Sequence, residues 1–98
     1  MAGRGIIVGR RMHRRETVAF THPVTGKTVY LAARTQWDGS WYTSDINRAK
    51  IRREPGVAAQ DLRYLPEVAR DMKGRVIDAR TVKGYVDKPS RADREEGR

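Results

Sequence analysis

Arginine is the most abundant side chain in this sequence that could take part in binding, because its guanidinium group binds phosphate or carboxylate. Sixteen of the 21 basic residues in the 98-residue chain are arginines, and the formal net charge is +9. The first fifteen residues hold no acidic residue and five arginines: Arg4, Arg10, Arg11, Arg14 and Arg15. A flexible polycation binds nucleic acid by displacing the counterions condensed on its phosphates. We therefore expect residues 1–15 to contact DNA or RNA phosphates, or an acidic groove on a protein.

A second group of cations falls in a segment, 45–54, that the sequence predicts to be helical. Ser44 is a suitable N-cap, and a Pro-Gly pair follows the segment and would end the helix. Arg48 and Arg52 lie four residues apart, on one face of such a helix, where they could reach phosphates across a groove. With Arg53 they form a predicted binding surface. The alternative is a solvated face whose arginines pair with nearby acidic residues.

A third candidate surface combines aromatic rings with a cation. If a hairpin forms at Asp38-Gly39, alternation along the strands places Tyr30, Arg34 and Trp41 on one face of the sheet. Bases of single-stranded nucleic acid stack on such rings, each worth about 1–3 kcal/mol. The chain holds only seven aromatic residues, however, and a small sheet needs its rings for packing. We expect these rings to lie in the core, and the stacking platform is the alternative.

Residues suited to catalysis or metal binding are scarce. The absence of cysteine excludes thiol nucleophiles, Cys-ligated zinc and disulfides. The two histidines, His13 and His22, show no helical ligand spacing with acidic residues and are interpreted as surface residues. Gly26-Lys27-Thr28 lacks the glycine that a phosphate-binding loop requires five positions earlier, at Thr21. We predict a non-enzymatic protein that uses no metal, cofactor or small-molecule substrate.

The first secondary-structure elements that the sequence predicts, and that would position the candidate residues, are strands. β-Branched and aromatic residues predict strands over 17–21 and 27–33. Asp38-Gly39 between two tryptophans predicts a two-residue hairpin loop, which pairs Thr35 with Tyr42 across a third strand. One face of this meander would then form the core, through five side chains: Val29, Leu31, Ala33, Trp37 and Tyr42.

Helical spacing of apolar residues covers 58–73. Pro66 interrupts this pattern, so either one helix kinks there or two short helices meet, with Pro66 in the first turn of the second. Gly74 is a suitable C-terminal cap, and residues 75–86 look extended and could add a last strand. The sequence thus predicts an α+β fold: a small antiparallel sheet of three or four strands, packed with two or three short helices.

Charge and hydropathy divide the chain into a basic flexible arm (1–15), a single α+β domain (16–86) and a charged tail (87–98). The middle part is near the size at which one hydrophobic core supplies only a few kcal/mol. A hydrophobic content of 38% excludes a wholly disordered chain. No apolar stretch is long enough for a signal peptide or a membrane span, so we expect a cytoplasmic or virion-associated protein with no membrane partner.

These features favour a small nucleic-acid-binding protein that contacts phosphate through the arm and the basic helix. The first alternative is a structural subunit of a large particle, such as a phage head or tail component, whose termini dock on neighbouring protein subunits. A less favoured alternative is a small inhibitor that docks on an acidic patch of another protein. The preference for arginine over lysine is also what a GC-rich genome produces, such as that of an actinobacterium or one of its phages.

Overall fold

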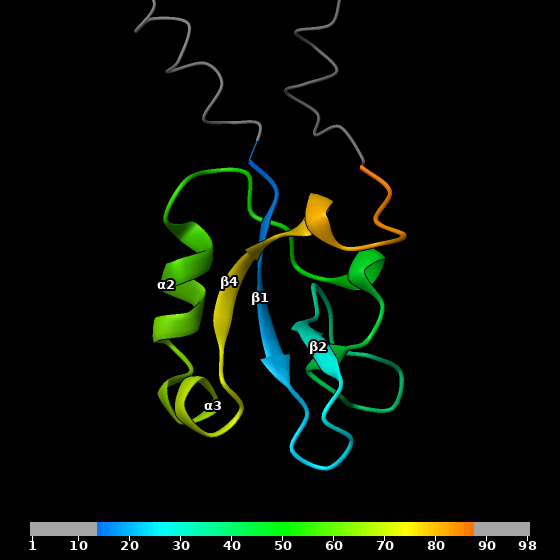
Figure 1. Ribbon diagram of the computed structural model, residues 1–98, viewed down its shortest axis with the longest axis vertical. Helices are drawn as coiled ribbons and strands as arrows, with labels where there is room; N and C mark the ends of the chain where they lie inside the picture. Colours follow the sequence, from blue (N-terminus) through cyan, green and yellow to red (C-terminus); the bar gives the residue numbers. More distant parts are fainter. Residues whose placement is uncertain (1–13, 88–98) are drawn as a thin grey trace, which may run out of the picture.

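The sheet is centred on strand β1 in a computed structural model that describes residues 14–87 (Figure 1). Four antiparallel strands lie in the order β3-β2-β1-β4. Their bounds are β1 Glu16–Thr21, β2 Thr28–Leu31, β3 Tyr42–Thr43 and β4 Arg75–Asp78. The predicted first two strands and the predicted last strand are confirmed, although the second and last strands are shorter than expected.

Helices cover both faces of the sheet. Their bounds are η2 Ile46–Arg48, α2 Val57–Arg63, α3 Pro66–Asp71 and η3 Ala79–Thr81, where η marks a 3-10 helix. On one face α2 and α3 pack against Val18, Phe20 and Val29. On the other face η2 and η3, together with residues 49–51 and 82–85, pack against Ala19 and Tyr30. The predicted α+β fold is confirmed, with two cores that use alternate residues of the same strands.

The predicted register of the second hairpin is wrong. Tyr42 pairs with Leu31 rather than with Thr35. Ala32 still donates its N–H to the Trp41 carbonyl at 3.0 Å, but the next residue turns away to the end of η2, where the Ala33 N–H donates to the Arg48 carbonyl at 3.0 Å. Residues 32–41 therefore form a loop rather than a continuation of the ladder, because the segment at 48–50 competes for their backbone groups.

Within this loop, Asp38-Gly39 belongs to a three-residue turn. The Gly39 N–H donates to the Gln36 carbonyl at 2.8 Å, and the Gln36 N–H donates to Ser40 at 2.9 Å. Gly39 takes the positive φ, +87°, that closes such a turn. The extra residue moves Trp37 to the tip, where it is 94% exposed. The predicted core position of Trp37 is wrong, as is that of Ala33, which is exposed.

The other three members of the predicted core face lie together as expected. Val29, Leu31 and Tyr42 all pack on the side of the sheet that faces α2 and α3. They share a face because Leu31 and Tyr42 are cross-strand partners and Val29 lies two residues before Leu31. The alternation of side chains along β2 was therefore predictable from the sequence, whereas the length of the loop at 32–41 was not.

The predicted helix over 45–54 is wrong beyond its first turn. The cap is Asp45 rather than Ser44, because the Asp45 carboxylate accepts from the Asn47 N–H at 2.9 Å. After η2 the chain is extended, and Arg52 exchanges both backbone hydrogen bonds with Glu16 at 2.9 and 2.7 Å. An extended chain here satisfies the backbone of β1 and still buries Ala49, which overrides the local helix preference.

Pro66 begins a second helix, which confirms the two-helix alternative. At the end of α3 the left-handed residue is Lys73, at φ +52°. The Gly74 N–H donates to the Ala69 carbonyl at 3.0 Å, which satisfies a carbonyl of the last turn. Gly74 therefore belongs to the C-terminal cap, as predicted. It contributes a backbone hydrogen bond, while the left-handed conformation usually supplied by glycine is adopted by Lys73.

Alanine at Gly74 is expected to destabilise the domain by about 1–3 kcal/mol, the usual range for overpacking. An added Cβ would lie 2.9 Å from the backbone Cα of Ala69 and 2.6 Å from Leu62 Cδ1, so the chain at Gly74 would have to move away from α3 and the Leu62 side chain on α2 would have to shift. Urea denaturation of the Gly74→Ala variant measures this loss. A free energy of unfolding equal to that of the unaltered protein would show that the two helices adjust without cost.

None of the helices in the part of the chain that the structure describes has the length and apolar character needed to cross a membrane.

Candidate nucleic-acid interface

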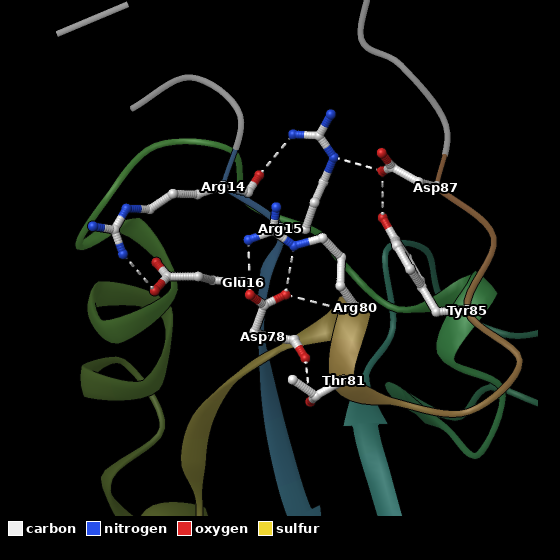
Figure 2. A network of polar contacts seen from close by, with 8 residues as sticks. All are labelled: Arg14, Arg15, Glu16, Asp78, Arg80, Thr81, Tyr85 and Asp87. Carbon is white, nitrogen blue, oxygen red and sulfur yellow. Dashed lines mark hydrogen bonds and ion pairs between the residues drawn. The ribbon is translucent and has the colours of Figure 1, made fainter. Parts of the chain in front are cut away.

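The structure describes two of the five arginines of the predicted arm. Arg4, Arg10 and Arg11 lie outside the described residues. Arg14 and Arg15 lead into β1 and belong to a polar network at one end of the domain (Figure 2). Arg14 bonds through its backbone N–H to the Arg53 carbonyl at 3.2 Å, and its half-exposed side chain lies 3.4 Å from Glu16.

Arg15 joins the start of the described chain to its end. Its Nε donates to Asp87 Oδ1 at 2.6 Å, and its Nη1 donates to the Arg14 carbonyl at 2.9 Å. The Tyr85 hydroxyl donates to the same Asp87 oxygen at 3.0 Å. Only 5% of the Arg15 side chain is exposed. Arg15 and Asp87, which the sequence places in the arm and the tail, are thus bonded to each other on the folded domain, and the chain enters and leaves it at the same end (Figure 1).

The pKa values of Asp87 and Tyr85 are both shifted in this network. The hydrogen bond from Arg15 holds the pKa of Asp87 below its usual range, and the bond from Tyr85 adds to this effect. Burial raises the pKa of Tyr85, and the neighbouring Asp87 carboxylate raises it further. The charged carboxylate and the neutral phenol are therefore the forms that the fold favours.

These shifts predict how stability depends on pH. A carboxylate with a lowered pKa adds stability above its unfolded value, about 4, and this stability is lost as the pH falls through the folded value. A phenol with a raised pKa loses stability as the pH rises above its unfolded value, about 10. We expect the Asp87→Asn variant to lose less stability on acidification than the unaltered protein, as measured by urea denaturation at a series of pH values. Glu54→Gln, at an exposed position, is the control, and parallel curves for Asp87→Asn and the unaltered protein would contradict the account.

Two further arginines are engaged by carboxylates. Arg52 donates to both oxygens of Asp61 on α2, at 2.7 and 2.9 Å, and this bond raises the pKa of Arg52. Arg80 on η3 likewise donates to both oxygens of Asp78, at 3.0 and 2.8 Å, and this bond lowers the pKa of Asp78. Such bidentate pairs fix the guanidinium plane. Arg52 was predicted to contact phosphate from a helix face, and the structure instead ties it to α2.

Arg53 is half-buried next to the start of the described chain, where its carbonyl accepts from the Arg14 N–H at 3.2 Å. It lines two small hollows, one with Glu54 and Val57, the other with Asn47 and Tyr85. Because the segment is extended at this point, the predicted surface of Arg48, Arg52 and Arg53 on one helix does not form.

Two of the predicted cations do come together, around a tryptophan that was not predicted to take part. Arg34, Trp37 and Arg48 line one hollow of about 560 Å³ between the loop at 32–41 and η2. Arg34 and Arg48 are both exposed. The Arg48 guanidinium lies 3.7 Å from the Asp45 carboxylate, and no carboxylate among residues 14–87 forms an ion pair with Arg34. We call the hollow lined by Arg34, Trp37 and Arg48 the basic hollow.

The alternative platform of Tyr30, Arg34 and Trp41 does not form. Tyr30 is buried against η2 and η3, as the core interpretation expected. Trp41 lies on the opposite face of the sheet, in edge-to-face contact with Phe20 at 5.3 Å and Tyr42 at 5.2 Å between ring centroids, but it is 37% exposed, so the expectation that it lies in the core is wrong. Sequence reasoning missed Trp37 because it placed the turn one residue too late. The available signal was a large ring immediately before an Asp-Gly pair.

Among residues 14–87, no three histidine or acidic side chains are placed to hold a metal ion. The chain matches no family model, and no curated protein or solved structure is significantly similar to it.

Proposed function

We propose that the protein is a non-enzymatic nucleic-acid-binding protein that contacts phosphate through the arginines of its N-terminal arm and through the basic hollow. The observation that carries this proposal is the uneven distribution of acidic residues: carboxylates pair with arginines in the domain, whereas the sequence of the first thirteen residues contains none. In the domain, the guanidinium groups of Arg15, Arg52 and Arg80 are engaged by carboxylates at 2.6–3.0 Å. The first thirteen residues hold three arginines and no acid, so nothing in that segment can neutralise them.

The basic hollow supports the same proposal from the domain itself. Arg34 and Arg48 flank it, and planar guanidinium groups suit the geometry of phosphate oxygens. A protein that neutralises phosphates binds less tightly as the salt concentration rises. The test is a fluorescence-anisotropy titration of labelled DNA and RNA oligonucleotides at low and at physiological salt. We expect binding that weakens steeply with salt, and an absence of binding to every oligonucleotide at low salt would refute the proposal.

A second candidate function, a structural subunit of a large particle, is favoured by a different observation. The Arg15–Asp87 contact makes the chain enter and leave the domain side by side. Two neighbouring segments could therefore reach one adjoining subunit together. Sedimentation velocity of nuclease-treated protein distinguishes the two functions. A concentration-dependent oligomer would favour assembly, whereas a monomer that binds oligonucleotides would favour the first proposal.

A further inference from the structure

We propose that the basic hollow is a site for single-stranded nucleic acid, with one unpaired base stacked on the Trp37 indole and the adjacent phosphates on Arg34 and Arg48. This inference rests on the proposed function and names the form of nucleic acid that the hollow takes. Its starting observation is the position of Trp37, which is 94% exposed yet lies beside two cations in a hollow of about 560 Å³.

Trp37 is presented by a turn that its neighbours hold in place. Gln36 closes the turn through two backbone bonds at 2.8 and 2.9 Å. The Asp38 carboxylate accepts from the Ser40 N–H at 3.0 Å, and the Gln36 side-chain amide donates to the Arg34 carbonyl at 2.8 Å. The base of the loop is tied by the Ala32 N–H to the Trp41 carbonyl at 3.0 Å. The backbone that carries the ring is therefore preorganised, which reduces the conformational entropy lost when a ligand binds.

The two tryptophans of the chain show that Trp37 is not needed for packing. Trp41, which is 37% exposed, packs its ring against the rings of Phe20 and Tyr42, whereas Trp37 makes no ring contact within the described residues. Trp37 packs on neither buried cluster. Tryptophan is enriched at binding interfaces, where its ring supplies apolar contact and its N–H a hydrogen bond, so an exposed indole beside two cations is suited to such a role.

The charges around Trp37 favour an anionic partner. Arg34 has no ion-pair partner among the described residues, and Arg48 has a single long contact of 3.7 Å with Asp45. Neither of the carboxylates nearest in sequence, Asp38 and Asp45, lines the hollow, and both accept from backbone N–H groups, Asp38 at Ser40 and Asp45 at Asn47. The hollow therefore combines a stacking surface with two phosphate ligands, which is the pattern of single-strand sites.

A duplex does not fit this pattern, because its bases are stacked on one another and offer only their edges in the grooves. The face of a base becomes available to an indole ring only when the strand is unpaired. The inference is therefore specific to single strands, whereas the arm arginines contact phosphates of either form.

The test compares point variants of the full chain by fluorescence anisotropy. The probes are an oligothymidylate of about 15 nucleotides, within the site sizes of single-strand binders, and a duplex of the same length. We expect Trp37→Ala to weaken binding to the single strand by about five- to 150-fold, the range for one stacked base. Affinity for the duplex should change less than about twofold. Tyr64→Ala, which removes another exposed ring, from the chain between α2 and α3, is the matched control and should change neither affinity.

Equal weakening for single strand and duplex, or no effect of Trp37→Ala on either, would overturn the inference. The variant Arg4→Gln/Arg10→Gln/Arg11→Gln separates this failure from that of the proposed function. If it weakens both affinities while Trp37→Ala weakens neither, nucleic-acid binding stands and the hollow is not its site. If the unaltered protein binds neither probe, both proposals fail. An unchanged urea midpoint for Trp37→Ala, as expected for an exposed side chain, excludes unfolding as the cause of the loss.

Discussion

Alanine in place of Phe20 is expected to lower the free energy of unfolding by about 3–5 kcal/mol, the usual cost of removing a buried aromatic ring. Phe20 is fully buried and lies on β1, the strand on which the sheet is centred. Its ring contacts Trp41 edge-on and packs in the cluster that joins the sheet to α2 and α3. Its loss would open a cavity between the sheet and both helices.

A loss of this size is a large fraction of the stability of a small domain, so the Phe20→Ala variant is expected to be partly unfolded at room temperature. Far-UV circular dichroism and urea denaturation measure the change. Val24→Ala is the control, because Val24 is exposed in the β1–β2 turn and its loss should change stability by less than about 0.5 kcal/mol. A cost below about 1 kcal/mol for Phe20→Ala would show that the helix-side core is not the main source of stability.

Neutralising the arm is expected to have the largest effect on binding. If Arg4, Arg10 and Arg11 each neutralise one phosphate of a duplex, replacing all three by glutamine should weaken binding by about 10²–10³-fold at 0.1 M salt. The three glutamines keep the length of the chain and remove only charge. A fluorescence-anisotropy titration with a labelled duplex measures the change.

The tail offers a matched control with the same change in charge. Arg91, Arg94 and Arg98 are also three arginines, but Asp93, Glu95 and Glu96 are interleaved with them. Because those carboxylates already offset the positive charge, the variant Arg91→Gln/Arg94→Gln/Arg98→Gln should bind nearly as tightly as the unaltered protein. Equal losses for the two triple variants would mean that overall charge, rather than the arm, determines binding.

Strands and helices were predictable where a local pattern agrees with the tertiary contacts. The alternation in β1 and β2 is preserved, and Pro66 marks a helix start because its ring fits only the first turn. The segment at 45–54 was not predictable, since its helix preference competes with backbone bonds between Arg52 and Glu16, distant in sequence. The prediction for residues 32–41 was wrong for the same reason. The segment at 48–50 forms backbone hydrogen bonds with Leu31 and Ala33, which would otherwise extend the hairpin.

The candidate site was predictable in its residue types but not in its grouping. Charge alone does not show which guanidinium groups will find carboxylates, and the pairing of Arg52 with Asp61 depends on the placement of α2. Arg34 and Arg48 meet only because the loop folds back onto η2. Trp37 joins them through a turn that contains one residue more than the preferred hairpin.

The central claim is that the arm arginines neutralise phosphates, and the salt dependence of duplex binding tests it most directly. The logarithm of the association constant should fall linearly with the logarithm of salt concentration. The slope for Arg4→Gln/Arg10→Gln/Arg11→Gln should be shallower than that of the unaltered protein by about 2.7, or 0.9 for each phosphate contact that is lost. Identical slopes for the two proteins would contradict the account.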